Sequence, residues 1–258
     1  MKALIKLGGA LLDTPESRAR LAREITQAAR DQEIAVVHGG GKQMTRYLTE
    51  HGIESRFVNG QRVTTPEILD AVLKLFAGSV NAELVSAFRT AGANPVGLSG
   101  VGGGLLDADP LDPALGHVGK PVHSDPRLLN LLIGAGYLPV VACVAGDSRG
   151  NMYNVNGDQT AAAIGAAFGA QKLIFLTDVD GVRGSDGTTL STLTATDALK
   201  LIEKGIASAG MQAKIGAAVS ALRGGVGEVV IAPGAREGVV ASLLQGQAIG
   251  TRMVEAMS

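Results

Sequence analysis

The 258-residue chain contains one cysteine, Cys143, and no tryptophan. A single cysteine excludes an intramolecular disulfide framework and fits a reducing compartment. Charge is also sparse, since charged residues make up 18% of the chain, the formal net charge is −1 and no block of Lys and Arg occurs. Binding to nucleic acid needs concentrated positive charge. We therefore expect no nucleic-acid partner.

Long hydrophobic runs and a targeting segment are missing as well. The longest apolar stretches, such as residues 138–145, are too short to span a bilayer. Residues 1–10 lack the charged leader, apolar core and cleavage site of a signal peptide. We expect no membrane association and a cytoplasmic location. Hydrophobic residues still make up 46% of the chain, which is enough for a sizeable buried core.

Strand-like and helix-like segments alternate along the whole chain. Apolar runs predict strands at 2–7, 34–38, 95–99, 138–143, 172–176 and 228–232. Helical spacing predicts helices at 15–30, 42–51, 65–90, 125–136, 156–169, 195–204, 211–223 and 239–244. This alternation predicts an α/β fold with an open, mostly parallel central sheet and helices on both faces, in three layers α/β/α.

The domain organisation is predicted as a single domain of residues 1–258 with two lobes. The polar, glycine-rich stretch 146–150 is the predicted boundary between an N-terminal lobe of about residues 1–150 and a C-terminal lobe of about residues 151–258. Residues 105–119, rich in Gly, Asp and Pro, are predicted to form a hairpin or an irregular flap.

Three glycine-rich turns directly follow apolar runs, at residues 6–9, 38–41 and 177–181. Glycine lets backbone N–H groups approach a phosphate closely, and the carboxyl ends of parallel strands meet at one edge of a sheet. Lys6 adds a positive charge suited to a transferring phosphoryl group. The turns predict phosphoryl chemistry, although neither a Walker A loop nor a dinucleotide fingerprint followed by a helix occurs.

Several polar residues are open to two interpretations. Lys214 on a predicted helix is by default an exposed lysine, and Arg62 a surface arginine, yet a guanidinium also suits two-point binding of a carboxylate. Asp158 is either an ordinary acid in the first helical turn or a carboxylate that holds two lysines in position. We expect His38 to be a packed residue without a catalytic role. The other histidines lack the spacing of a metal site, so no metal site on the protein is predicted.

Taken in order, these clusters resemble the amino acid kinase family over essentially the whole chain. The resemblance rests on residues 6–9, 38–41, 59–64, 115–119, 136–140, 154–159, 177–182 and 210–214. Within the family, the motifs are most similar to those of members that phosphorylate the γ-carboxylate of N-acetyl-L-glutamate. The resemblance implies the amino acid kinase fold, ATP as co-substrate, and Mg²⁺ held mainly through phosphates and water.

The resemblance also implies a role for each site residue. The implied catalytic residues are Lys6, Lys214 and Asp158. The two lysines flank the transferred phosphoryl group and neutralise its charge, and the carboxylate of Asp158 orients the lysines. The implied acyl-substrate residues are Gly40, Gly41, Arg62 and Asn154. The implied nucleotide residues are Gly9, Thr177, Asp178, Val179, Asp180, Gly181, Val182 and Met211. The implied reaction yields an acyl phosphate in arginine biosynthesis.

The resemblance further implies a homodimer with residues 65–90 as an interface element. The sequence lacks the N-terminal helix that accompanies hexamers and arginine inhibition in the family, so no inhibition by arginine is expected. Two alternatives stay open. One is a kinase of carrier-protein-linked α-aminoadipate in lysine biosynthesis, and the other is an amino-acid-sensing binding protein without catalysis. The presence of both Lys6 and Lys214 favours a catalyst, because binding alone does not need both cations.

Overall fold

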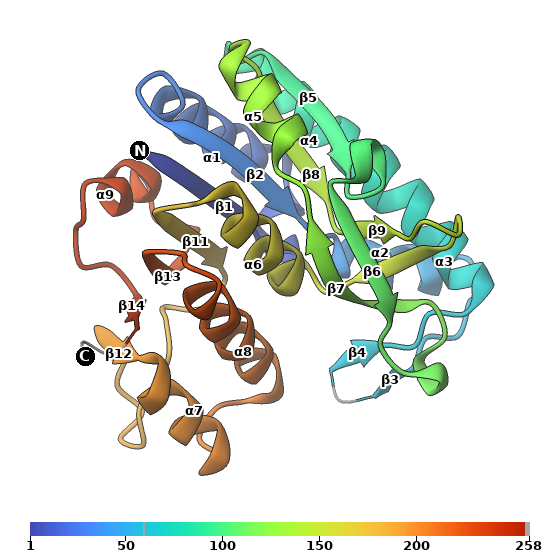
Figure 1. The fold of residues 1–258 in the computed structure, drawn as a ribbon. Helices are drawn as coiled ribbons and strands as arrows, with labels where there is room; N and C mark the ends of the chain where they lie inside the picture. The colour runs from blue at the N-terminus through green and yellow to red at the C-terminus, as the bar shows by residue number, and fades with distance from the viewer. Residues whose placement is uncertain (59, 256–258) are drawn as a thin grey trace.

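The computed structural model describes residues 1–58 and 60–255, so Asn59, which opens the predicted 59–64 motif, lies outside the described residues. An eight-stranded sheet in the order β12-β14-β13-β11-β1-β2-β8-β5 forms the centre of the molecule (Figure 1). Its strands are β1 (Lys2–Leu7), β2 (Glu33–His38), β5 (Pro95–Ser99), β8 (Leu138–Ala142), β11 (Lys172–Thr177), β12 (Thr192–Thr194), β13 (Glu228–Pro233) and β14 (Thr251–Val254). Neighbouring strands run parallel except for the β13–β14 pair.

Helices cover both faces of this sheet because strand side chains alternate between the faces. On β1, Ala3, Ile5 and Leu7 pack in one core cluster with α1 (Pro15–Ala28), α4 (Asn81–Thr90) and α9 (Val239–Leu244). Leu4 faces the opposite cluster, which includes α5 (Arg127–Gly134), α6 (Gly157–Phe168), α7 (Ala195–Glu203) and α8 (Ala209–Arg223). The predicted three-layer α/β/α fold is confirmed.

A small closed barrel lies beside the main sheet and was not predicted. It consists of β6 (Leu106–Pro110), β7 (Val118–Ser124), β9 (Val144–Gly146) and β10 (Met152–Val155). Of the two forms predicted for residues 105–119, a hairpin or an irregular flap, the structure has a hairpin, the antiparallel β6–β7 pair, whose second strand continues to Ser124. Residues 146–150 end β9 and lead into β10, and these two strands pair with each other. The division into lobes near residue 150 stays a prediction.

The predicted helix 65–90 is interrupted. It consists of α3 (Pro66–Val72), a π-helical stretch (Leu73–Val80) and α4, and Gly78 has non-helical dihedral angles of φ −102° and ψ −106°. A π-helical stretch accommodates one more residue per turn than an α-helix, and apolar spacing alone does not reveal it. This stretch and α2 (Gly41–Glu50) pack behind the carboxyl end of β8 in a third core cluster.

A separate two-stranded sheet lies near the site. The short hairpin of β3 (Phe57–Val58) and β4 (Gln61–Arg62) lies at the edge of the molecule, across from α8 (Figure 1). Side chains cap the starts of two of these helices: Thr14 accepts a hydrogen bond from the Ser17 N–H before α1, and Asn156 caps α6. Across residues 1–58 and 60–255, no helix has the length and apolar character needed to cross a membrane.

Candidate active site

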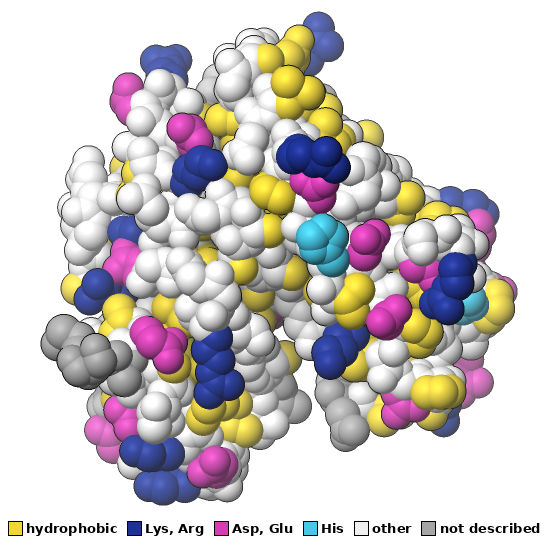
Figure 2. Space-filling view, viewed as in Figure 1, with side chains coloured by type: hydrophobic (Ala, Val, Ile, Leu, Met, Phe, Trp, Pro, Cys, Tyr) yellow, Lys and Arg dark blue, Asp and Glu magenta, His cyan; other side chains and the backbone are white. Residues whose placement is uncertain are grey.

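Two cavities meet at the carboxyl ends of the central strands. The larger, of about 720 Å³, is lined by the triple-glycine turn, the start of α2, the β3–β4 hairpin and residues 154–157. The smaller, of about 360 Å³, is lined by the turns after β1 and β11 and by the start of α8. Four residues line both cavities: Lys6, Gly9, Gly41 and Lys42. In the space-filling view the surface is notched between the α7–α8 region and the β3–β4 region (Figure 2).

One carboxylate connects two lysines where the cavities meet. Asp158 Oδ1 lies 2.7 Å from Lys6 Nζ, and Asp158 Oδ2 lies 2.9 Å from Lys214 Nζ. The three residues come from β1, the first turn of α6 and α8, and all three are largely buried. Lys6 lines both cavities and Lys214 lines the smaller one. Two cations against one anion leave an excess positive charge facing the cavities, which suits a phosphoryl group.

The local sequence explains how Asp158 reaches both lysines. Asn156 caps α6, because its side-chain oxygen accepts hydrogen bonds from the N–H groups of Asp158 and Gln159. The cap places Asp158 in the first turn, where the helix dipole stabilises a carboxylate. Gly157 leaves room for Lys6, since a Cβ at this position would lie 3.2 Å from Lys6 Cε.

The electrostatics of the cluster follow from burial and mutual proximity. Burial raises the pKa of Asp158, but the ammonium groups of Lys6 and Lys214 outweigh it and lower this pKa to about 2. Burial, followed by the charge of Lys6, lowers the pKa of Lys214 from its ordinary value. The carboxylate therefore stays ionised at neutral pH and holds its two partners at a fixed separation.

The glycine turns lie in direct contact with each other. A Cβ on Gly9 would lie 3.0 Å from the backbone nitrogen of Gly41, and a Cβ on Gly40 would lie 2.7 Å from the Phe76 ring. Gln43 joins the turns by donating a hydrogen bond of 3.1 Å from Nε2 to the Gly9 carbonyl. Side chains at Gly9 or Gly40 are thus sterically excluded. Since α2 begins at Gly41, its first N–H groups form an anion-binding helix start at the cavity.

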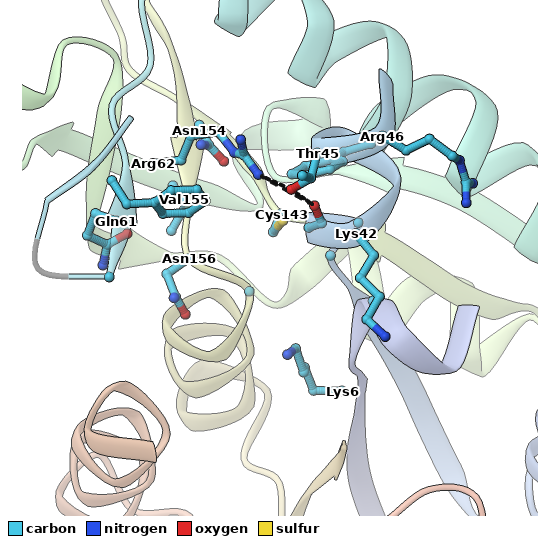
Figure 3. A pocket seen from close by; sticks show the side chains of 18 of the residues that line it. Lys6, Lys42, Thr45, Arg46, Gln61, Arg62, Cys143, Asn154, Val155 and Asn156 are labelled. Carbon is cyan, nitrogen blue, oxygen red and sulfur yellow. Dashed lines mark hydrogen bonds between the residues drawn. The ribbon is translucent and has the colours of Figure 1, made fainter. Parts of the chain in front are cut away.

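Arg62 is buried beside the larger cavity and has no acidic partner among residues 1–58 and 60–255. Its guanidinium donates to Thr45 Oγ1 at 2.7 Å (Figure 3). It also donates to Ser55 Oγ and lies over the Phe57 ring at 4.5 Å. The ion pairs within the described part of the chain do not include Arg62, which is 8% exposed. A buried guanidinium whose hydrogen-bond partners are neutral has the charge and geometry to accept an anion such as a carboxylate.

Asn154 lines the same cavity from β10. Its Nδ2 donates a hydrogen bond of 3.0 Å to Thr64 Oγ1, and the Thr64 hydroxyl in turn donates to the Arg62 carbonyl. The β4 segment and β10 are thereby fixed relative to each other. The predicted acyl-substrate residues Gly40, Gly41, Arg62 and Asn154 all line the larger cavity.

The predicted nucleotide residues divide into two groups. Five of them line the smaller cavity: Gly9, Thr177, Asp178, Val179 and Met211. Asp180, Gly181 and Val182 do not line it. Val182 is buried and its N–H donates to Thr251 Oγ1 at 2.8 Å, while Gly181 has a φ of 143° against the same threonine. The structure thus turns Gly181 and Val182 toward β14, away from the cavity.

Sequence reasoning missed several residues that line or support these cavities. Thr45 lies four residues after Gly41, so its approach to the cavity follows from helical spacing once α2 is placed. Ser55, Phe57 and Phe76 come from a loop, a two-residue strand and the π-helical stretch. These elements carry no periodic signal that points to a site. Lys42 was not given a role either, although it lines both cavities.

Within residues 1–58 and 60–255, no cluster of three or more His, Cys, Asp or Glu side chains is arranged to hold a metal ion. Both oxygens of Asp158 are engaged by lysines. Cys143 borders the larger cavity but is buried, and burial raises the pKa of its thiol to about 12. The thiol therefore stays protonated at neutral pH.

The chain is similar in sequence to known kinases. An acetylglutamate kinase from Solibacter usitatus is 58% identical over 257 residues, which is 99% of this chain and 100% of that protein. An acetylglutamate kinase from Geobacillus kaustophilus is 42% identical, with 90% of this chain and 89% of that protein covered.

Solved structures share the fold. N-acetylglutamate synthase from Neisseria gonorrhoeae, complexed with coenzyme A and N-acetyl-glutamate, matches with a TM-score of 0.87 and 28% identity, over 100% of this chain and 60% of that chain. Carbamate kinase from Giardia lamblia, bound to AMP-PNP, matches with a TM-score of 0.76 over 99% of this chain and 98% of that chain. The latter likeness, at 18% identity, shows the fold alone. A model of the amino acid kinase family matches residues 1–233, and the chain belongs to that family.

Proposed function

We propose that the protein transfers the γ-phosphoryl group of ATP to the γ-carboxylate of N-acetyl-L-glutamate, producing N-acetylglutamyl 5-phosphate in arginine biosynthesis. The observation that carries this proposal is the Lys6–Asp158–Lys214 cluster at the meeting point of two cavities. Relatives named acetylglutamate kinase, at 58% and 42% identity, support the choice of acid.

The larger cavity receives the acyl substrate. Arg62 binds a carboxylate of N-acetyl-L-glutamate with its buried fork, and Asn154 orients the substrate from the neighbouring strand. The N–H groups of Gly40 and Gly41 donate to oxygens at the reacting end. Lys6 lies where the larger cavity continues into the smaller one, so the reacting carboxylate and the transferred group meet beside its ammonium group.

The smaller cavity receives ATP through Gly9, Thr177, Asp178, Val179 and Met211. For Asp180, Gly181 and Val182 we propose an indirect role in shaping the turn after β11. A glutamyl carboxylate is ionised at neutral pH and is already a competent nucleophile, so no general base is needed. Catalysis then depends on in-line positioning and on neutralising the charge of the transferring group by Lys6 and Lys214.

Asp158 does not touch the substrate in this proposal. Its two short contacts hold the ammonium groups in position before ATP binds. Mg²⁺ fits the site as an ion held mainly by phosphate oxygens and water, because both oxygens of Asp158 are occupied by lysines. When bound with ATP, such an ion would add to the charge neutralisation that Lys6 and Lys214 supply.

We also propose that the protein is a cytoplasmic homodimer. The main sheet ends at β5, an edge strand next to the helical run of residues 66–90. An open edge of this kind favours coverage by a second subunit. Equilibrium sedimentation across a range of protein concentrations tests this proposal, and a concentration-independent mass of one chain contradicts it.

The decisive experiment is an assay with ATP, Mg²⁺ and N-acetyl-L-glutamate in which hydroxylamine traps the acyl phosphate as a hydroxamate. L-Glutamate and N-acetyl-L-aspartate serve as control acids, since they lack the acetyl group and one methylene respectively. We expect turnover with N-acetyl-L-glutamate. Turnover only with carrier-linked α-aminoadipate supports the lysine-pathway kinase instead, and ligand binding without turnover supports a sensing protein.

A further inference from the structure

The triple-glycine turn is supported from behind by a buried pair of polar side chains. His38, the last residue of β2, is fully buried, and its Nδ1 lies 2.9 Å from the Gly39 carbonyl oxygen. Its Nε2 lies 2.9 Å from Asn81 Nδ2. A carbonyl oxygen accepts only, so Nδ1 carries the proton and Nε2 accepts from the Asn81 amide. The second N–H of that amide donates to the Val140 carbonyl at 3.0 Å.

This arrangement requires a neutral imidazole. Burial lowers the pKa of His38 to about 4, the hydrogen bond to Gly39 opposes this shift, and the charge of Lys6 adds to it. At neutral pH the ring therefore has one donor and one acceptor, and both are satisfied. Neither His38 nor Asn81 lines a cavity, so neither side chain contacts the substrates directly.

The π-helical stretch explains how Asn81 reaches His38. Phe76 packs on Gly40, and Asn81, five residues later, bonds to His38 on the same glycine turn. On a regular α-helix, residues five apart point about 140° away from each other. The run between Phe76 and Asn81 is not a regular α-helix, because Gly78 has non-helical dihedral angles and the Asn81 N–H donates to the Gly78 carbonyl, and both side chains reach the same glycine turn. A glycine at position 97 makes room, since a Cβ there would lie 2.2 Å from Asn81 Oδ1.

We propose that His38 and Asn81 are positioning residues that fix the Gly39 carbonyl and thereby aim the N–H groups of Gly40 and Gly41 into the larger cavity, with the π-helical stretch as their support. The proposal deepens the function proposed above, because these N–H groups are the donors assigned to the acyl substrate. Phe76 blocks movement of the turn in one direction, while the hydrogen-bonded pair fixes its peptide planes.

The test replaces Asn81 with leucine, which keeps the number and branching of side-chain heavy atoms but removes both N–H donors. We expect the KM for N-acetyl-L-glutamate to rise about tenfold, with the KM for ATP changing less than threefold. The matched control is Leu84→Ala. Leu84 is fully buried in the next turn of α4, so this substitution creates a cavity there. We expect this control to lower the melting temperature and to leave both KM values unchanged.

A second readout does not depend on the identity of the substrate. Hydrogen exchange of a peptide covering residues 36–44, followed by mass spectrometry, reports on the glycine turn in the free protein. We expect at least tenfold faster exchange in Asn81→Leu and wild-type exchange in Leu84→Ala. Failure of wild-type turnover with N-acetyl-L-glutamate overturns the proposed function but leaves this readout intact.

Two results overturn the positioning role. One is unchanged exchange at residues 36–44 in Asn81→Leu. The other is an equal loss of kinetics in Asn81→Leu and Leu84→Ala, which indicates general destabilisation rather than positioning. Where Asn81→Leu fails to fold, Asn81→Ser, a smaller polar replacement, is measured in the same way.

Discussion

At the scale of single residues, the site is defined by charges that the protein itself leaves incompletely balanced. Lys6 and Lys214 share one carboxylate, and Arg62 has neutral hydrogen-bond partners only among the described residues. Buried cations without matching anions destabilise a folded chain unless a ligand supplies the missing charge. Both imbalances face the cavities, so both are expected to be relieved by anionic substrates.

Replacing Lys6 with methionine tests the first imbalance. We expect kcat to fall by 10² to 10³, roughly 3–4 kcal/mol of transition-state stabilisation, because the charge acts most strongly on the transferring group. Binding of ATP should weaken much less, because other residues also line the nucleotide cavity. Steady-state kinetics and calorimetric titration with ATP measure the two effects. Lys200→Met, an exposed lysine on α7, is the matched control and should behave as wild type. Equal losses in kcat and ATP affinity contradict the assigned role.

Replacing Arg62 with methionine tests the second imbalance. The KM for N-acetyl-L-glutamate should rise at least thirtyfold, about 2 kcal/mol, because a charged hydrogen-bonding partner of the carboxylate is lost. The free protein should be no less stable than wild type, since methionine removes an unpaired buried charge. Thermal unfolding with and without substrate measures this. A clear loss of stability together with an unchanged KM places Arg62 in a structural role instead.

At the scale of elements, the sequence predicted most of the main sheet and the convergence of its loops. Lys6, Gly40 and Thr177 follow or end apolar runs, and parallel strands bring their carboxyl ends together. The closed barrel could not be predicted, because β9 and β10 are short and close the barrel by pairing with β6 and β7, which are distant in sequence. Register between such strands depends on tertiary packing rather than on local pattern.

The candidate site, like the fold, could be predicted only in part from the sequence. The bridging carboxylate was an open alternative in the sequence, since Asp158 also fits an ordinary helix start. Only the geometry shows that the start of α6 lies close enough to both β1 and α8 for one aspartate to contact both lysines. The π-helical stretch was hidden for a physical reason, because its apolar residues follow helical spacing on both sides of Gly78.

The cap of α6 provides an element-scale prediction. Asn156→Ala removes the acceptor for the N–H groups of Asp158 and Gln159, which should cost about 1 kcal/mol of stability. Because Asp158 holds both lysines, we also expect kcat to fall about tenfold. Thr194→Ala removes the equivalent cap of α7, remote from the cavities, and should cost similar stability without a kinetic effect. Equal kinetics in the two variants would show that the α6 cap does not position Asp158.

At the scale of the whole molecule, two buried groups make stability depend on pH in the acidic range. The folded-state pKa values of His38 and Asp158 are lowered to about 4 and about 2, from 6.5 and 3.8. The unfolded chain therefore takes up these protons at higher pH than the folded chain. The contribution of His38 to the free energy of unfolding is fully present above pH 6.5 and decreases as the pH falls toward 4. The contribution of Asp158 decreases between pH 3.8 and 2.

The predicted loss of stability between pH 6.5 and 4 is on the order of 3 kcal/mol from His38. Urea unfolding at pH 7, 5.5 and 4.5 measures it, and His123→Gln, an exposed histidine, should leave the pH dependence unchanged. Imidazole proton resonances in the native protein give a direct check, because His38 should not titrate above pH 5. A native His38 that titrates near pH 6.5 would mean that the imidazole is not held neutral between Gly39 and Asn81, and the glycine turn would then lack its fixed support.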